Sequence, residues 1–211
     1  MAPEEDQLHE HWNQIYSGNP ASSLSWYQDH PEHSLRRIQA TGIAPSSAAV
    51  IDVGGGASKL VDALLAEGYH NPTVLDLAEA GLEIAKRRLG TQAQRASWIA
   101  GNILHKDLAR NGYNIWHDRA VFHFLINQQL RHDYLNRALH AVRPGGHLII
   151  TTFAEDGPGQ CSGLPVVRYN LEQLQQQFAP SFSLLSHERE LHRTPTGAVQ
   201  SFLSCHFHRC G

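Results

Sequence analysis

The stretch Val50-Ile-Asp-Val-Gly-Gly-Gly56 is a short apolar run that ends in three consecutive glycines. Glycine allows a tight backbone turn and leaves space for a ligand against the main-chain amides. Residues 58–67 follow with apolar side chains at helical spacing. The order predicts a strand over 49–53, a turn, and a helix over 58–67. Such a turn at the end of a buried strand is typical of nucleotide and nucleoside sites in α/β proteins.

The next predicted strand, over 73–76, ends in Asp76, about 20 residues beyond Gly56. A carboxylate at this spacing can accept hydrogen bonds from both hydroxyls of a ribose. With the glycines, it favours a nucleoside cofactor over a turn that only lets a helix pack closely on a sheet. Lys59 stands where a dinucleotide-binding turn has its third glycine, and it lacks the preceding glycine of a phosphate-binding P-loop. Both of these alternative patterns are therefore incomplete.

Apolar runs alternate with amphipathic ones from about residue 49 onward, which predicts a mostly parallel sheet covered by helices. The predicted strands are 49–53, 73–76, 97–100, 113–117, 147–153, 182–185 and 201–207, the last two as an antiparallel pair. The predicted helices are 7–17, 32–41, 58–67, 78–89, 127–142 and 171–178. Residues 154–168, rich in glycine and proline, form a long irregular connection of the type that often carries function.

Composition limits the classes of function. The 211 residues, 41% of them hydrophobic, suffice for one substantial core, so we expect a single domain over 1–211. A net charge of -3 gives no general attraction to nucleic acid or to an anionic membrane, and we expect neither as a partner. Three cysteines, an acidic start without the pattern of a secretory signal, and the lack of a membrane-spanning stretch favour a cytoplasmic protein.

Three ordered motifs resemble class I S-adenosylmethionine-dependent methyltransferases. Ile51-Asp-Val-Gly-Gly-Gly56 is similar to the first motif of that family, Leu75-Asp76 to its acidic end of the second strand, and Arg143-Pro-Gly-Gly146 to its turn into the fifth strand. The resemblance extends from His11 to the last predicted strand. It implies an α/β fold with a doubly wound, mostly parallel seven-stranded sheet, helices on both faces, and an antiparallel last strand. It also implies S-adenosyl-L-methionine as the cofactor.

By this resemblance, Gly54 and Gly56 would lie against the methionine part of the cofactor, and Asp76 would hold its ribose. Leu77 would pack on the adenine, and Asp52 would anchor the turn. Asn102 departs from the carboxylate that the family usually has there, although its side-chain oxygen can still accept a hydrogen bond from the adenine amino group. The full set of expected cofactor contacts is Trp12, Tyr16, Trp26, Asp52, Gly54, Gly55, Gly56, Asp76, Leu77, Gly101, Asn102, Ile103 and Asp118.

Residues 1–45 form the expected N-terminal cap, or lid, of the domain. Their aromatic side chains can enclose a sulfonium cation, or they can simply pack on the core, and the sequence leaves both readings open. The segments His11-Trp12-Asn13 and Ser25-Trp-Tyr27 resemble a subgroup that contains protein-lysine methyltransferases of translation factors. Asp118 is followed by Arg119-Ala-Val-Phe-His123, which is not the usual continuation in those lysine enzymes. The acceptor, protein lysine or small molecule, therefore stays open.

Asp118 and His123 are the expected catalytic residues, because they follow the fourth predicted strand toward the crevice at the carboxyl ends of the sheet. Either can receive a proton from an ammonium or hydroxyl acceptor. The alternatives are that His123 is a packed core histidine and that Asp118 only orients the amino group of the cofactor.

Two further functions compete with methyl transfer. One is a nicotinamide-dependent oxidoreductase, which the missing third glycine disfavours, and the other is a cofactor-binding module without turnover. The terminal run Cys205-His-Phe-His-Arg-Cys210 suggests a metal site, but on a strand His206 and His208 share one face while Cys205 lies on the other. We therefore expect no metal, and a final strand with exposed histidines.

Overall fold

The computed structural model describes residues 5–211, and residues 1–4, the start of the expected cap, lie outside the described part. The strands of the main sheet are β1 (Val50–Val53), β2 (Thr73–Asp76), β3 (Ser97–Ala100), β4 (Tyr113–Arg119), β5 (Val142–Phe153), β8 (Phe182–Arg193) and β9 (Val199–Arg209). A separate short hairpin consists of β6 (Gln160–Cys161) and β7 (Leu164–Pro165). The α-helices are α1 (Glu5–Gly18), α2 (Glu32–Gln39), α3 (Leu60–Ala66), α4 (Glu79–Leu89), α5 (Gln128–Ala141) and α6 (Leu171–Phe178). The 3-10 helices are η1 (Ala21–Ser23), η2 (Gly90–Arg95) and η3 (Phe122–Phe124).

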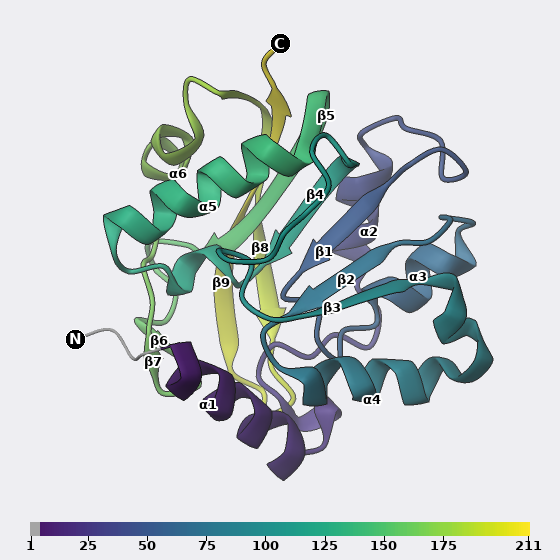
Figure 1. The fold of residues 1–211 in the computed structure, drawn as a ribbon. Coiled ribbons are helices and arrows are strands. Elements are labelled where there is room, and N and C mark those ends of the chain that lie inside the picture. The colour runs from purple at the N-terminus through teal and green to yellow at the C-terminus, as the bar shows by residue number, and fades with distance from the viewer. Residues whose placement is uncertain (1–4) are drawn as a thin grey trace.

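The strand order of the main sheet is β3-β2-β1-β4-β5-β9-β8 (Figure 1). Strands β1 to β5 are parallel, whereas β9 runs antiparallel to both of its neighbours, β5 and β8. The predicted fold class, a mostly parallel sheet with an antiparallel last strand, is confirmed. The order reverses between β1 and β4, and an α/β sheet binds ligands beyond the carboxyl ends of its strands at such a point.

Helices cover both faces of this sheet. Helices α2 and α3 pack through Ile38 and Leu64 on one face, where they meet β1, β4 and β5. Helices α5 and α6 pack on the opposite face through Ala138 and Phe178, and Figure 1 shows these two pairs on opposite sides of the strands. Helix α1 lies apart from both layers, near the carboxyl ends of the strands and in contact with α4. This end of the sheet is therefore covered by the N-terminal segment.

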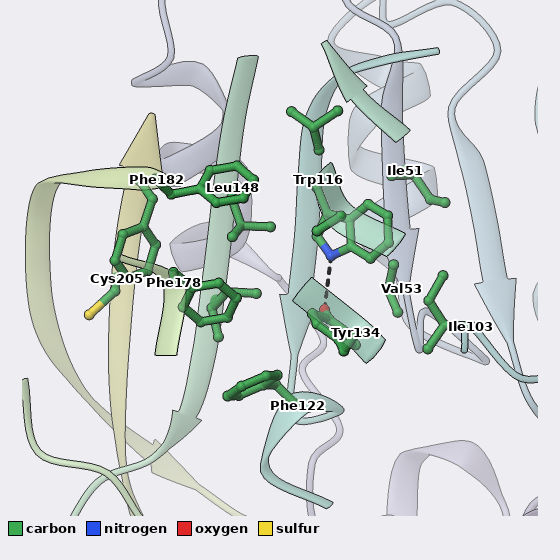
Figure 2. Packing of buried hydrophobic residues seen from close by; sticks show 14 of the residues in the cluster. Ile51, Val53, Ile103, Trp116, Phe122, Tyr134, Leu148, Phe178, Phe182 and Cys205 are labelled. Carbon is green, nitrogen blue, oxygen red and sulfur yellow. Dashed lines mark hydrogen bonds between the residues drawn. The ribbon is translucent and has the colours of Figure 1, made fainter. Parts of the chain in front are cut away.

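The core under α5 contains a buried polar chain. The indole Nε1 of Trp116 donates a 2.8 Å hydrogen bond to the Tyr134 hydroxyl (Figure 2), and that hydroxyl donates in turn to the Asp118 carboxylate. All three side chains are fully buried. Because buried polar groups cost free energy unless they are bonded, this chain specifies how α5 sits on β4.

Most predicted elements are present, with some differences in extent. The strands expected over 73–76 and 97–100 and the helix over 171–178 have the predicted bounds. Strand β4 continues two residues beyond the prediction, to Arg119. Strand β5 already begins at Val142, because the register with β4 shifts between Tyr113 and Ile115, and this irregularity accommodates Pro144-Gly-Gly146 inside the strand.

The prediction for the strand over 182–185 was too short, since β8 extends to Arg193. Its second half is rich in charged residues, which are common in strands at the edge of a sheet. Such a sequence lacks the apolar run by which a strand is predicted. The connection over 154–168 is not wholly irregular, because it contains the β6–β7 hairpin. The expectation of exposed histidines on the last strand is wrong for His206, which is 3% exposed and bonded to His147 at 2.9 Å.

Two negative findings concern residues 5–211. No helix in this range is both long and apolar enough to cross a membrane. Within the same range, no three histidine, cysteine, aspartate or glutamate side chains gather as a group that could hold a metal ion.

Replacing Tyr134 by Phe tests the buried chain of hydrogen bonds. The change leaves the Trp116 N–H without its acceptor and deprives the buried Asp118 carboxylate of a donor, so we expect a loss of about 1–3 kcal/mol in the free energy of unfolding. Urea denaturation measures the change. The control is Tyr113→Phe, because the half-buried Tyr113 hydroxyl has no hydrogen-bond partner among residues 5–211. Equal shifts in the two variants would show that the chain contributes nothing specific.

Candidate functional site

The glycine turn after β1 has no room for side chains. Gly54 and Gly56 have φ values of +72° and +42°, in the region that favours glycine. A Cβ on Gly54 would lie 2.0 Å from a methyl group of Val121, and a Cβ on Gly56 would lie 2.2 Å from the Tyr16 hydroxyl. The turn is fastened to β2, because the amides of Gly54 and Gly55 donate to the carbonyl of Leu75.

Asp76, the last residue of β2, lies beside this turn. A Cβ on Gly56 would come within 2.8 Å of its carboxylate, and the amide of Ala78 donates to the same carboxylate at 2.8 Å. The predicted meeting of the glycine turn and the acidic residue is thus present in the structure. Burial raises the pKa of Asp76 to about 7, and the Asp52 charge adds to this, while the amides of Ala78 and Gly56 oppose it.

A cavity of about 300 Å³ opens at this end of the sheet. Its walls come from the carboxyl ends of β1, β2, β3 and β4, from α1, from the segment around η3, and from the β6–β7 hairpin. The lining residues are Leu8, Trp12, Tyr16, Trp26, Val53, Gly54, Leu75, Asp76, Leu77, Gly101, Asn102, Ile103, Leu104, His105, Arg119, Ala120, Val121, Phe124, Leu125, Ile126, Leu130, Cys161, Leu164 and Pro165. We call the part around Gly54, Asp76 and Asn102 the cofactor end.

Aromatic rings from the N-terminal segment form one wall of the cavity. The ring of Trp12 meets those of Trp26 and Phe124 edge to face, with centroids 5.7 and 5.2 Å apart. Tyr16 packs against Trp26 at 6.2 Å and reaches the glycine turn. Burial raises the pKa of Tyr16 well above its usual range, and Asp76 adds to this effect. The wall thus closes the cofactor end with rings and with a neutral hydroxyl.

Most expected cofactor contacts line this cavity, but four do not. Asp52 and Gly55 line a smaller neighbouring cavity of about 50 Å³ behind the turn, where Asp52 is bonded to His117 at 2.7 Å. Gly56 faces Tyr16 and Asp76. The fourth, Asp118, is buried beneath the wall.

The two expected catalytic residues do not reach the cavity. Asp118 is fully buried and accepts hydrogen bonds from the amides of Val121 and Phe122 as well as from Tyr134. Burial raises its pKa to about 6, against the effect of these bonds. His123 is also fully buried, and its Nδ1 accepts from the amide of Phe153. Burial, with a smaller effect of Arg119, lowers the pKa of His123 to about 3, which makes it a poor proton acceptor.

Asn102 lies where it was expected, after β3 at the cofactor end. Its side-chain oxygen accepts a 3.0 Å hydrogen bond from the amide of Leu104, which fixes the orientation of the side chain. An amide oxygen has two lone pairs, so this oxygen can accept one further hydrogen bond.

Sequence reasoning missed the other half of the cavity. Arg119, the apolar residues from Phe124 to Ile126, and the hairpin residues Cys161, Leu164 and Pro165 line it. Two signals were available, the unusual continuation after Asp118 and the glycine-rich connection over 154–168. We call the part lined by Phe124, Leu125, Ile126, Leu130, Cys161, Leu164 and Pro165 the acceptor end.

A sheet of this order, with a glycine turn after β1 and a carboxylate ending β2, is the Rossmann-like arrangement, and its turn lacks the third glycine of the pyrophosphate-binding form. A family model for a methyltransferase domain matches residues 50–146. Over this stretch, which is just under half of the chain, the sequence is similar to that methyltransferase domain.

Curated relatives are similar over part of their length. A ubiquinone/menaquinone biosynthesis C-methyltransferase UbiE of Roseobacter denitrificans is 28% identical over 50% of this chain and 42% of its own. An EEF1A lysine methyltransferase 2 of Danio rerio is 24% identical over 76% of this chain and 65% of its own. The chain thus spans less than two thirds of the length of either relative.

Solved structures share the fold. One solved structure concerns the conversion of a disulfide bond into a thioacetal group during echinomycin biosynthesis. It is 17% identical to this chain with a TM-score of 0.76, and the match covers 96% of this chain and 92% of that chain. The 1,6-didemethyltoxoflavin-N1-methyltransferase of Burkholderia thailandensis, with S-adenosylhomocysteine bound, has a TM-score of 0.68 and 18% identity. It covers 99% of this chain and 92% of its own. At these identities the likeness concerns the fold alone.

Asp76→Asn tests the electrostatic cost of the buried carboxylate. Its pKa is raised above the unfolded value, so its ionised form destabilises the fold above pH 7, and this penalty fades as the pH falls from 7 toward 4. We expect the variant to be more stable than the parent at pH 8, by on the order of 1–3 kcal/mol, with a shrinking difference toward pH 5. Thermal unfolding across this pH range measures it.

Asp156→Asn is the matched control. Asp156 is exposed, and hydrogen bonds from Ser201 and Arg189 hold the pKa of its carboxyl below the usual range. Its removal should therefore leave stability unchanged or reduce it slightly. A loss of stability for Asp76→Asn at pH 8 would contradict the assignment of a strained carboxylate.

Proposed function

We propose that this chain transfers the methyl group of S-adenosyl-L-methionine to a small-molecule acceptor. The observation that carries the proposal is the convergence of the tight glycine turn and the buried Asp76 on one end of a cavity of about 300 Å³. The other end of this cavity is closed by apolar side chains. A concave cavity with this mostly apolar lining suits small molecules better than the docking of an extended protein segment.

The residues present fit the cofactor. Positions 54 and 56 have no room for a Cβ, which keeps the main chain accessible to a ligand. Asp76 would hold the ribose hydroxyls, Leu77 and Ile103 would contact the adenine, and Asn102 would accept from its amino group. The aromatic wall of Trp12, Tyr16 and Trp26 would face the sulfonium, since ring quadrupoles attract cations. This role for α1 supports our proposal that residues 1–45 form a cap.

When bound, the cofactor supplies a methyl group on a positively charged sulfur, open to in-line displacement. The contribution of the chain is then to hold the acceptor at attack distance and to exclude water, and positioning alone can account for a large part of such a rate. The apolar side chains of the acceptor end and the aromatic wall suit this task. No strong base has to line the cavity if the acceptor arrives deprotonated.

We propose that Asp118 is a positioning residue and not the proton acceptor. Its carboxylate binds the amides of Val121 and Phe122, the first residues of the segment that forms the cavity wall beyond β4. His123 holds the neighbouring strand through Phe153. The side chains of Asp118 and His123 therefore support the cavity wall without facing the cavity.

Cofactor binding gives the direct test. Titration of the chain with S-adenosylhomocysteine in a calorimeter should yield saturable binding, and Asp76→Asn should weaken it at least tenfold at pH 8, because the amide offers the ribose hydroxyls a single acceptor oxygen. The affinity of the parent should fall below pH 7, where the carboxylate takes up a proton, and the variant should lack this dependence. Asp156→Asn should bind like the parent. An absence of heat with the parent chain would refute the proposal.

Asp118→Asn separates positioning from catalysis. If the carboxylate only holds the wall, the variant should lose stability by about 1–3 kcal/mol but retain cofactor affinity and methyl transfer within about tenfold per folded molecule. Transfer of labelled methyl groups into a cell extract, measured at a temperature where the variant is folded, provides the comparison. A loss of transfer of a thousandfold or more at unchanged affinity would instead identify a catalytic carboxylate. Binding without any transfer by the parent would favour a module without turnover.

A further inference from the structure

The acceptor end has one charged side chain, Arg119, at its border with the cofactor end. Arg119 is the last residue of β4 and lines both the main cavity and the smaller one behind the glycine turn. Its side chain is only 10% exposed. The other titratable side chains that line the main cavity are Tyr16, Asp76, His105 and Cys161. A cation buried to this extent costs free energy unless anionic or hydrogen-bonding groups surround it.

The protein supplies only part of these partners. Glu190, 3% exposed, accepts from Nη2 of Arg119 at 3.1 Å, and the carbonyl of Trp26 accepts from Nη1 at 3.5 Å. The guanidinium lies 4.4 Å from the centroid of the Phe202 ring. A guanidinium has five N–H donors, and Nε is buried without an acceptor among the residues that the structure describes. Arg119 therefore has donors to spare for an acceptor group on a ligand.

Arg119 is located on the side of the acceptor end. Trp26, Phe124 and Cys161 belong to one cluster with Phe202, the ring on which the guanidinium lies. Burial raises the pKa of the Cys161 thiol, and the charge of Arg119 is among the effects that oppose this. Cys161 is the last residue of β6, before the turn of the hairpin, and it lines the acceptor end. The positive charge of Arg119 therefore acts on the part of the cavity where the second substrate would lie.

The described lining of the acceptor end offers no evident base for a lysine acceptor. An ammonium group must lose a proton before it can attack. Among the lining residues of 5–211, the side chains that could take this proton are Asp76 and His105, and these belong to the cofactor end and to the segment that follows Asn102. Asp118 and His123 lie behind the wall. Arg119 would also repel an ammonium at the acceptor end, whose other lining side chains are mostly apolar, so that charge interactions there are strong.

We propose that the acceptor end binds a small, mostly apolar molecule that carries an oxyanion, and that Arg119 binds this oxyanion. The inference rests on the proposed function and names its class of acceptor. A carboxylate, or a phenol or enol acidified by the guanidinium, is deprotonated near neutral pH without a base from the protein. This matches the acceptor end as the structure describes it, where Arg119 supplies a cation and the lining side chains include no carboxylate or histidine.

The transfer then balances in atoms and charge. A lone pair of the oxyanion, or of the carbon conjugated to it in an enolate, forms the bond to the methyl carbon while the sulfur–methyl bond breaks and its electron pair stays on sulfur. The anion and the sulfonium become a neutral methylated product and a neutral thioether. Because the charges cancel along the way, apolar walls favour the step.

Two probes of equal shape and opposite charge test the inference. The chain is first saturated with S-adenosylhomocysteine, and 4-phenylbutanoate or 4-phenylbutylamine is then titrated into the complex at pH 7.5. We expect the anion to bind at least tenfold more tightly than the amine. We also expect Arg119→Gln to abolish this preference, and Arg119→Lys, which keeps the charge without the planar fork, to retain part of it.

The control is Glu190→Gln, which leaves Arg119 in place and removes the carboxylate that neutralises it, so the affinity for the anion should stay or rise. If Arg119→Gln alone unfolds because Glu190 is left unpaired, the double variant Arg119→Gln/Glu190→Gln removes both charges and should show the same lost preference.

Tighter binding of the amine, a preference that survives in the Arg119 variants, or no binding of either probe would overturn the inference. A parallel loss of affinity for S-adenosylhomocysteine in Arg119→Gln would also overturn it, because Arg119 would then hold the carboxylate of the cofactor. Failure of the parent chain to bind S-adenosylhomocysteine at all would count against the proposed function instead.

Discussion

The site depends on a negative charge held where water is scarce. Asp76 stands at the end of β2 against a turn that has no space for side chains, and burial raises the pKa of its carboxyl to about 7. The amides of Ala78 and Gly56 offset this cost only in part, and a ligand with two hydroxyl donors would stabilise the carboxylate further. The glycines matter for the same reason, since any side chain at position 56 would displace Tyr16 or Asp76. The fold is thus destabilised at the place where, in our proposal, the cofactor binds.

A second buried carboxylate shapes the opposite wall of the cavity. Asp118, the last but one residue of β4, lies under α5 and accepts hydrogen bonds from Tyr134 and from two amides of the following segment. Those amides belong to the residues that turn the chain from β4 into η3, and the side chain of Val121 in this turn touches the glycine turn. One carboxylate therefore lies at the proposed cofactor site itself, whereas the other supports the cavity wall through the main chain.

The sequence predicted the central part of the fold well, because β1, β2 and β3 are short apolar blocks between glycines and polar turns. It also predicted the glycine turn and Asp76 as neighbours, since spacing along parallel strands determines where their carboxyl ends meet. The charged half of β8 was missed, because an edge strand keeps few apolar residues.

The acceptor end could not be predicted from the sequence, for a different reason. It depends on how the connection over 154–168 folds back as a hairpin over η3, and no local pattern determines such a contact. The inward orientation of Asp118 could have been inferred. Residues two apart on a strand share a face, so Asp118 lies under α5 with the buried Trp116, while Arg119 points with His117 to the other side.

The charges around the cavity point to a common requirement. Arg119 and Glu190 form a pair that is neutral as a whole and nearly buried. A cofactor with a sulfonium adds one positive charge to this environment, and an oxyanion on the second substrate restores neutrality before the reaction and leaves two neutral groups after it. An ammonium acceptor would instead place two cations beside Arg119 in a low-dielectric cavity. Glu190 is already paired with Arg119, and the described lining of the acceptor end has no further carboxylate to offset this cost. The same apolar walls that disfavour one class of acceptor therefore assist the reaction of the other.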